Sequence, residues 1–100
     1  MIKEETLYAV AINIVAAYEK SVRIISGISD PHKTFNAQKT FALVAVDELI
    51  RRNERSKLSQ HVPNDVRTFL FVDTQELLAI RNIIHLLNIK TYTEHEKASQ

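Results

Sequence analysis

The scarcity of glycine and proline is the feature that most restricts what this chain can fold into. One glycine and two prolines occur among its 100 residues, so tight turns, which depend on these two residue types, must be few. Hydrophobic residues make up 45% of the sequence and charged residues 25%, as in an ordinary globular protein. Long helices with few connections are favoured. We therefore expect an all-α fold, a small antiparallel bundle of three to four helices.

Hydrophobic periodicity places the first two helices. Apolar residues recur at spacings of three and four from Lys3 to Ser26, which predicts one long helix. Gly27 follows the last periodic residue, where a left-handed cap is easiest to form. Ser29 or Asp30 is expected to cap a second helix, with Pro31 in its first turn, and Thr34 is a competing start. This helix is expected to run to about residue 55.

The second half of the chain is less regular. Glu54 to Asp65 is polar and is expected to be the main loop. The segment from Val66 to Val72 fits either a short strand or a helix, and we favour a helix because a lone strand has no partner in so small a domain. Asp73 and Glu76 have the spacing of a capping box, which predicts the start of another helix. Asn88 is expected to cap its end.

The length fits one helical domain, residues 1–90, followed by a polar segment, residues 91–100, that we expect to fray. A net charge of +1 gives no overall attraction to nucleic acid or to an anionic membrane. The N-terminal sequence carries two glutamates where a signal peptide is basic. The longest apolar stretch, from Leu7 to Tyr18, is too short to cross a bilayer. We therefore expect a cytoplasmic protein that does not contact membranes.

Arg81 and His85 are the first candidates for chemistry. They lie four residues apart on a predicted helix, so their side chains share one face. A guanidinium group binds phosphate and an imidazole exchanges protons near neutral pH. Together they suit the cleavage of RNA by attack of a 2′-hydroxyl on the neighbouring phosphate. The alternative is structural, with Arg81 in solvent at the edge of the helix and His85 half-buried beside Leu78.

The run Arg81-Asn82-Ile83-Ile84-His85, late in a small helical bundle, resembles the HEPN domains, many of which are RNases or toxins of bacterial defence systems. The likeness extends backwards by pattern, through Ile25-Ser26-Gly27-Ile28-Ser29, Phe35, Leu58-Ser59 and Pro63. The family places four to six residues between the arginine and the histidine, whereas this chain has three. One residue fewer turns the following side chain by about 100°. The resemblance implies an RNase that uses Arg81 and His85, or an inactive or reassigned relative.

A basic cluster near the end of the second helix is the next candidate. It consists of Arg51, Arg52, Arg55 and Lys57. Clustered cations bind phosphates and release counterions, which predicts a nucleic-acid site. Cations also favour the C-terminal end of a helix, and Glu48 can pair with Arg52 at a spacing of four. The cluster is therefore either a nucleic-acid site or a solvated helix end.

No motif for a metal, a cofactor or a nucleophile is present. His32, His61, His85 and His95 are each isolated, so we expect no metal site. The absence of cysteine excludes disulfides and thiolate ligands. The single glycine excludes a phosphate-binding loop and makes a nucleophile elbow improbable. A non-enzymatic protein without a small-molecule cofactor is favoured over an enzyme.

By elimination, the sequence favours a small protein that binds another macromolecule through helical apolar faces, such as an antitoxin, an immunity protein, an inhibitor or a regulator. Apolar residues surround the middle of the second helix. They are more numerous than the core of three short helices needs. The excess is expected to form a homodimer seam or to bind another protein. Phe69 and Phe71 are the candidate anchors. The alternative is that a fourth helical turn, or the segment from Val66 to Val72, covers the excess apolar residues within the monomer.

Overall fold

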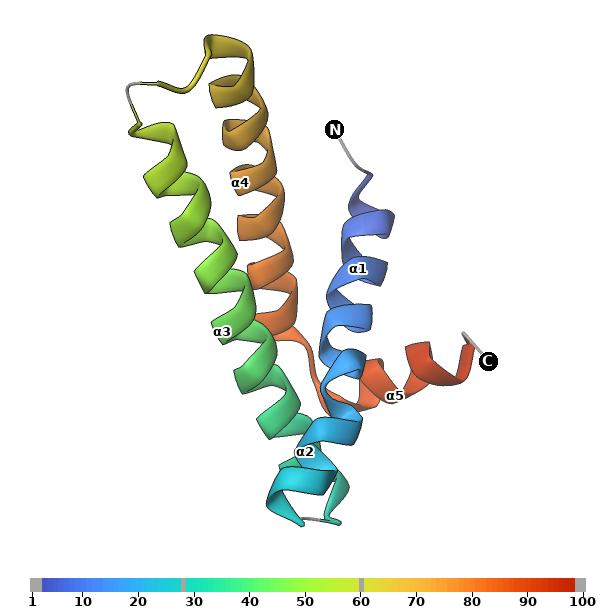
Figure 1. Cartoon of the computed structure of the whole chain (residues 1–100). Coiled ribbons are helices and arrows are strands. Elements are labelled where there is room, and N and C mark those ends of the chain that lie inside the picture. The colour runs from blue at the N-terminus through green and yellow to red at the C-terminus, as the bar shows by residue number, and fades with distance from the viewer. Residues whose placement is uncertain (1–2, 28, 60, 99–100) are drawn as a thin grey trace.

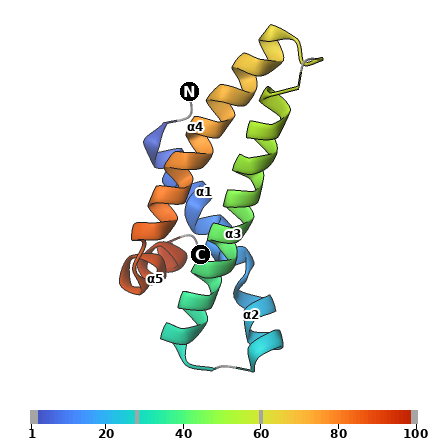
Figure 2. The same cartoon turned by 90° about the vertical axis from the view of Figure 1, so that its left-hand side faces the viewer.

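The computed structural model describes residues 3–27, 29–59 and 61–98, and this part of the chain forms five helices. They are α1 (Glu4–Ala17), α2 (Glu19–Ser26), α3 (Pro31–Lys57), α4 (Asn64–Leu86) and α5 (Ile89–Ala98). α3 and α4 make a long hairpin, and α1 and α2 lie along the half that holds the start of α3 and the end of α4 (Figures 1 and 2). The described residues include no strand, so the predicted all-α bundle is confirmed. Ile28, Gln60 and residues 99–100, parts of the expected turn, loop and tail, lie outside the described residues.

The N-terminal segment is broken, whereas the sequence predicts one helix over residues 3–26. α1 ends at Ala17 and α2 begins at Glu19, with Tyr18 between them. The carbonyl oxygen of Val15 accepts hydrogen bonds from Gln38 Nε2 at 3.0 Å and from the Tyr18 N–H group at 3.2 Å. A side chain that enters the hydrogen-bond ladder of a helix is a usual cause of a kink. The break therefore arises from a contact with α3, which the local periodicity does not encode.

The turn into α3 follows the sequence prediction. Gly27 ends α2 with a φ of 63°, the left-handed conformation that glycine adopts without a steric penalty. The Asp30 carboxylate accepts hydrogen bonds from the backbone N–H groups of His32 and Lys33, and Pro31 stands in the first turn. α3 then runs without interruption to Lys57, two residues beyond the predicted end.

The loop between α3 and α4 is shorter than the predicted segment from residue 54 to residue 65. α3 continues to Lys57, and α4 begins at Asn64. Pro63 directly precedes α4, a position where its missing N–H group costs nothing. The segment 66–72 is helical, as favoured, and lies inside α4. The predicted start at Asp73 is wrong. Its carboxylate instead accepts a hydrogen bond from Asn53 of α3, at 2.7 Å.

The end of the chain also departs from the prediction. α4 ends at Leu86, its C-cap is Leu87 rather than Asn88, and Asn88 accepts a hydrogen bond from the backbone N–H group of Thr91 at 2.8 Å. Asn88 therefore caps the start of α5 rather than the end of α4. The predicted frayed tail is helical as far as Ala98, and Tyr92 within it is buried. One large side chain that packs into the core fixes this short helix.

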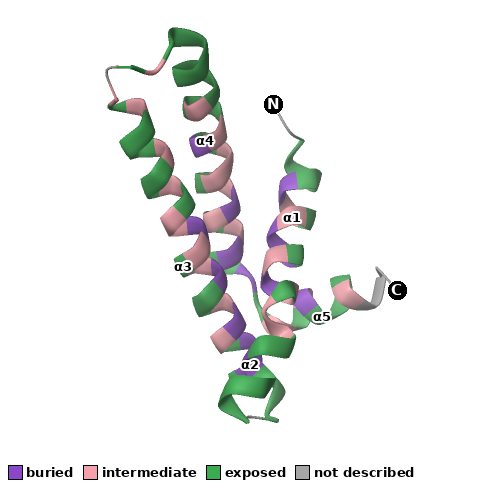
Figure 3. Cartoon of the chain, in the orientation of Figure 1, coloured by how far each residue is buried: buried purple, intermediate pink, exposed green. Residues whose placement is uncertain are grey.

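The hydrophobic core lies where α1 meets the α3–α4 hairpin, close to the start of α3 and the end of α4 (Figure 3). Val15, Val46 and Ile84 are almost completely buried there. Burying one such side chain contributes about 1.5–3 kcal/mol relative to leaving it in water. The remaining core residues are Leu7, Ala11, Ile12, Phe35, Ala42, Ile80, Leu87 and Tyr92. None of the described helices is long and apolar enough to cross a membrane.

One buried amide joins three parts of this core. Gln38 of α3 is only 2% exposed, and its Nε2 donates to the Val15 carbonyl oxygen of α1 and, at 3.2 Å, to the Tyr92 hydroxyl of α5. Burial raises the pKa of Tyr92, partly offset by the bond from Gln38. Because the hydroxyl is held in its neutral form, its contribution to stability is complete below about pH 10 and is lost as the pH rises above that value.

Replacing Gln38 by Leu should destabilise the protein by about 1–3 kcal/mol, because the buried Val15 carbonyl and Tyr92 hydroxyl each lose a partner while little volume changes. Urea unfolding followed by circular dichroism measures this difference. Gln75→Leu is the matched control, since Gln75 is exposed on α4, and its effect should stay within about 0.5 kcal/mol. Equal stability of Gln38→Leu and the parent would contradict the proposed role of this amide.

Candidate functional site

The far end of the α3–α4 hairpin has no core of its own. We call residues 47–73 the hairpin tip. Every residue described within it is exposed or only partly buried, whereas Val46 just before it and Thr74 just after it are buried (Figure 3). Helices in proteins derive most of their stability from packing of an apolar face. The tip is therefore the part of the molecule with the least internal support.

Polar contacts hold the two helices of the tip together. Asp47 pairs with Arg81 of α4 at 2.6 Å, and Asn53 with Asp73 at 2.7 Å. Lys57 Nζ lies 5.5 Å from the centre of the Phe71 ring. These contacts keep α3 and α4 in antiparallel register as far as the loop. They involve partly exposed groups, so each adds little to stability.

Apolar stripes of the core continue into the tip without a cover. On α4, Phe69 and Val72 extend the stripe of Ile80 and Ile84, with Glu76 between them at the same helical spacing. On α3, Leu49 extends the stripe of Ala42 and Val46. The proximal residues of both stripes pack in the core beside α1, but Phe69 is 66% exposed, and Leu49 and Val72 are also exposed. We call Leu49, Val66, Phe69 and Val72 the inner face of the tip.

The two predicted anchors, Phe69 and Phe71, lie on different sides of α4. Both are exposed, as a partner surface requires, and Phe71 is 54% exposed. Two residues of a helix are separated by about 200° around its axis, so Phe71 points away from the inner face and towards Lys57. A flat partner can contact one of these rings but not both. The segment 66–72 also leaves Phe41 and Val44 of α3 exposed, so it does not cover the middle of that helix.

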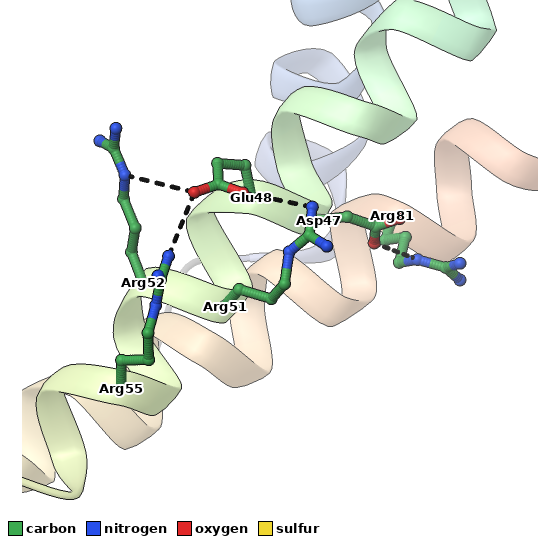
Figure 4. A network of polar contacts seen from close by, with 6 residues as sticks. All are labelled: Asp47, Glu48, Arg51, Arg52, Arg55 and Arg81. Atoms are coloured by element: carbon green, nitrogen blue, oxygen red, sulfur yellow. Dashed lines mark hydrogen bonds and ion pairs between the residues drawn. The ribbon is translucent and has the colours of Figure 1, made fainter.

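The basic cluster forms around a single carboxylate (Figure 4). The Glu48 carboxylate forms ion pairs with Arg51 at 3.2 Å, with Arg55 at 3.2 Å and with Arg52 at 3.8 Å. Three guanidinium groups thus share one negative charge, which leaves a local excess of two positive charges. Lys57 pairs separately with Glu54 at 2.9 Å. A recess of about 440 Å³ lies among Glu48, Arg51, Glu54 and Arg55. The sequence indicates only one of these pairs, Glu48 with Arg52.

Arg81 and His85 lie on α4 away from this cluster. The Arg81 Nε group is held by Asp47 Oδ1, and Figure 4 shows its guanidinium group pointing away from the three arginines. His85 is exposed rather than half-buried. Its backbone carbonyl accepts a hydrogen bond from Lys39 Nζ at 3.0 Å. The geometry therefore provides a solvent-accessible imidazole beside an arginine that already has a carboxylate partner.

The histidines do not gather into a site. His32 and His61 are exposed, and the His95 ring lies 4.9 Å from the ring of Tyr8. Among the residues that the structure describes, no group of three metal-ligating side chains comes together.

Leu49 and Val72 are exposed apolar residues of the tip that are not predicted from the sequence. The spacing of three between Phe69 and Val72, and of eight from Val72 to Ile80, was a usable signal. The capping box predicted at Asp73 and Glu76 obscures this apolar spacing, because a helix start at Asp73 divides the stripe in two.

No family model, curated protein or solved structure matches this chain.

The positions of Arg81 and His85 allow a direct test of the family resemblance. An RNase that uses this pair should cleave single-stranded RNA, and both Arg81→Ala and His85→Ala should abolish cleavage. The Arg81 side chain is 43% exposed, so loss of its ion pair should cost at most about 1 kcal/mol and leave the fold intact. Gel analysis of RNA and circular dichroism of each variant measure the two effects. Intact RNA with the parent protein would exclude this activity.

Proposed function

We propose that this protein is a non-enzymatic binding protein, of the antitoxin, immunity, inhibitor or regulator kind, and that its binding surface is the hairpin tip. The observation that carries the proposal is the absence of a buried residue among those described between residues 47 and 73. A two-helix segment without a core gains stability when a partner covers its apolar side chains.

The distribution of exposed apolar residues supports the same surface. Six of the twelve large hydrophobic side chains that are exposed among the described residues lie in the tip, namely Leu49, Leu58, Val66, Phe69, Phe71 and Val72. Patches of this kind, rimmed by charged residues, mark protein-interaction sites. Aromatic residues and arginines are the residue types that most often dominate the energy of such interfaces. The tip supplies both residue types, with Phe69 and Phe71 on α4 and Arg51, Arg52 and Arg55 on α3.

A test uses the protein as bait in extracts of the organism that produces it, with cross-linking and mass spectrometry to identify what binds. Phe69→Asp combined with Phe71→Asp should abolish capture of the specific partner, because both faces of the tip then carry a charge where apolar contact is needed. Leu86→Asp is the matched control, since Leu86 is 78% exposed on the same helix but outside the tip, and it should retain capture. Equal capture by all three proteins would contradict the proposal.

A second candidate, nucleic-acid binding, is favoured by the excess of positive charge around Glu48. Arg51, Arg52 and Arg55 extend from consecutive turns of α3, and one carboxylate neutralises only part of their charge. Phosphate groups of a nucleic acid would compete with Glu48 for the same guanidinium groups.

Under this candidate, affinity for a short RNA or DNA duplex should fall on the order of 50-fold between 50 and 200 mM salt, since about three phosphate contacts are lost to screening. The variant with Arg51, Arg52 and Arg55 all replaced by Gln should lose both the binding and the salt dependence. Replacement of Lys20, Lys33 and Lys90 by Gln is the matched control, because these lysines are exposed elsewhere. Fluorescence anisotropy measures the affinity, and a flat salt response would rule the candidate out.

A further inference from the structure

We propose that the inner face of the hairpin tip, formed by Leu49, Val66, Phe69 and Val72, binds the same face of a second copy of this chain in antiparallel orientation. The inference rests on the proposed function, because both use the hairpin tip. It assigns a second copy of the chain to the inner face of that tip. The two hairpin ends would together form a four-helix bundle, the arrangement in which each pair of helices supplies the core that the other lacks.

The apolar stripes of the core continue into the tip. Ala42 and Val46 on α3, and Ile80 and Ile84 on α4, are buried in the core to which α1 contributes. The stripes run on through Leu49 and Phe69, but α1 does not. Figures 1 and 2 both place the N-terminal end of α1 beside the middle of α4. A helical surface that continues the role of α1 is therefore what the inner face lacks, and a second hairpin supplies two helices.

The charges near the inner face favour the same orientation. The exposed residues Glu4 and Glu5 lie in the first turn of α1, and the start of α1 lies beside the middle of α4 (Figures 1 and 2). Arg52 and Arg55 lie near the far end of α3 and carry the excess positive charge around Glu48. In an antiparallel pair, the arginines of each copy approach the glutamates of the other, twice by symmetry. A tip-to-tip arrangement would instead bring the two arginine clusters together, and like charges in an interface disfavour it.

The small area of the inner face sets the strength of the contact. The inner face spans seven positions of α4, from Val66 to Val72, or roughly 10 Å in length, beside Leu49 of α3, across two helices each about 10 Å wide. Such a face buries less than the roughly 800 Å² per partner of a standard interface. We therefore infer a reversible dimer that forms and dissociates with concentration, rather than a permanent one.

The test is sedimentation velocity of the full chain over a wide concentration range. The mass should rise from the monomer value of 11.5 kDa towards twice that value. Phe69→Asp should weaken the dimer at least about tenfold. Phe71→Asp makes the same change of volume and charge on the opposite side of α4, and it should leave the dimer affinity unchanged. A monomer at every concentration, or equal effects of the two variants, would overturn the inference.

A mixing experiment tests the antiparallel orientation. One variant carries Arg52→Glu and Arg55→Glu, and the other carries Glu4→Lys and Glu5→Lys. Each alone should dimerise roughly tenfold more weakly, because like charges then face one another at both ends. An equimolar mixture should restore association. The acidic tip of the first variant then meets the basic start of α1 in the second, and the basic tip of the second meets the acidic start of α1 in the first. Failure of the mixture to associate would exclude this orientation.

These results separate the inference from the proposed function. A pure monomer whose tip nevertheless captures a different protein would refute the dimer and leave the binding function in place. A dimer that obeys the mixing test, while the tip captures nothing else, would support the dimer and refute binding of another macromolecule at this surface. Circular dichroism of each variant confirms that the helices remain.

Discussion

The hydrogen bonds of Gln38 determine how the helices of this protein meet. A buried amide must find partners, because an unpaired polar group in the core is costly. Gln38 finds them in the Val15 carbonyl of α1 and the Tyr92 hydroxyl of α5. The first bond coincides with the break at Tyr18, which lets α2 change direction. The second draws a short polar helix into the core. Among the described residues, no buried side-chain nitrogen or oxygen is left without a partner.

This arrangement divides the hairpin into two unlike halves. Near Gln38, apolar side chains from α1, α3 and α4 share one core, whereas beyond Val46 only α3 and α4 remain. There the helices are joined by ion pairs, one amide–carboxylate contact and a lysine over an aromatic ring. Of the apolar residues at this end, Ile50 is partly buried and packs against the core, whereas Leu49, Val66, Phe69 and Val72 are exposed.

The sequence was sufficient for the fold class because its signals were local. Periodic apolar residues predicted the helices, and Gly27, Asp30 and Pro31 placed the turn between α2 and α3 correctly. The errors came from contacts between distant residues. Gln38 acts on Val15 from 23 positions away, and Asp73 bonds across the hairpin instead of capping a helix. The candidate surface depends on how far α1 reaches along its neighbours. The periodicity of one helix does not say how far a neighbouring helix extends along it. Phe69 and Phe71 could therefore be named as candidates, but the side of α4 that α1 leaves uncovered could not be predicted.

The two halves of the hairpin also imply two levels of cooperativity in the folded chain. Regions with few buried contacts open at a lower free energy than the global unfolding reaction. Backbone amides at the end of α3 and the start of α4 are therefore expected to exchange with solvent through local opening, while those around Gln38 exchange only when the whole bundle unfolds. A molecule that covers the tip would tie the two regions into one cooperative unit. Binding would then be registered as a change in local dynamics without any change in the core.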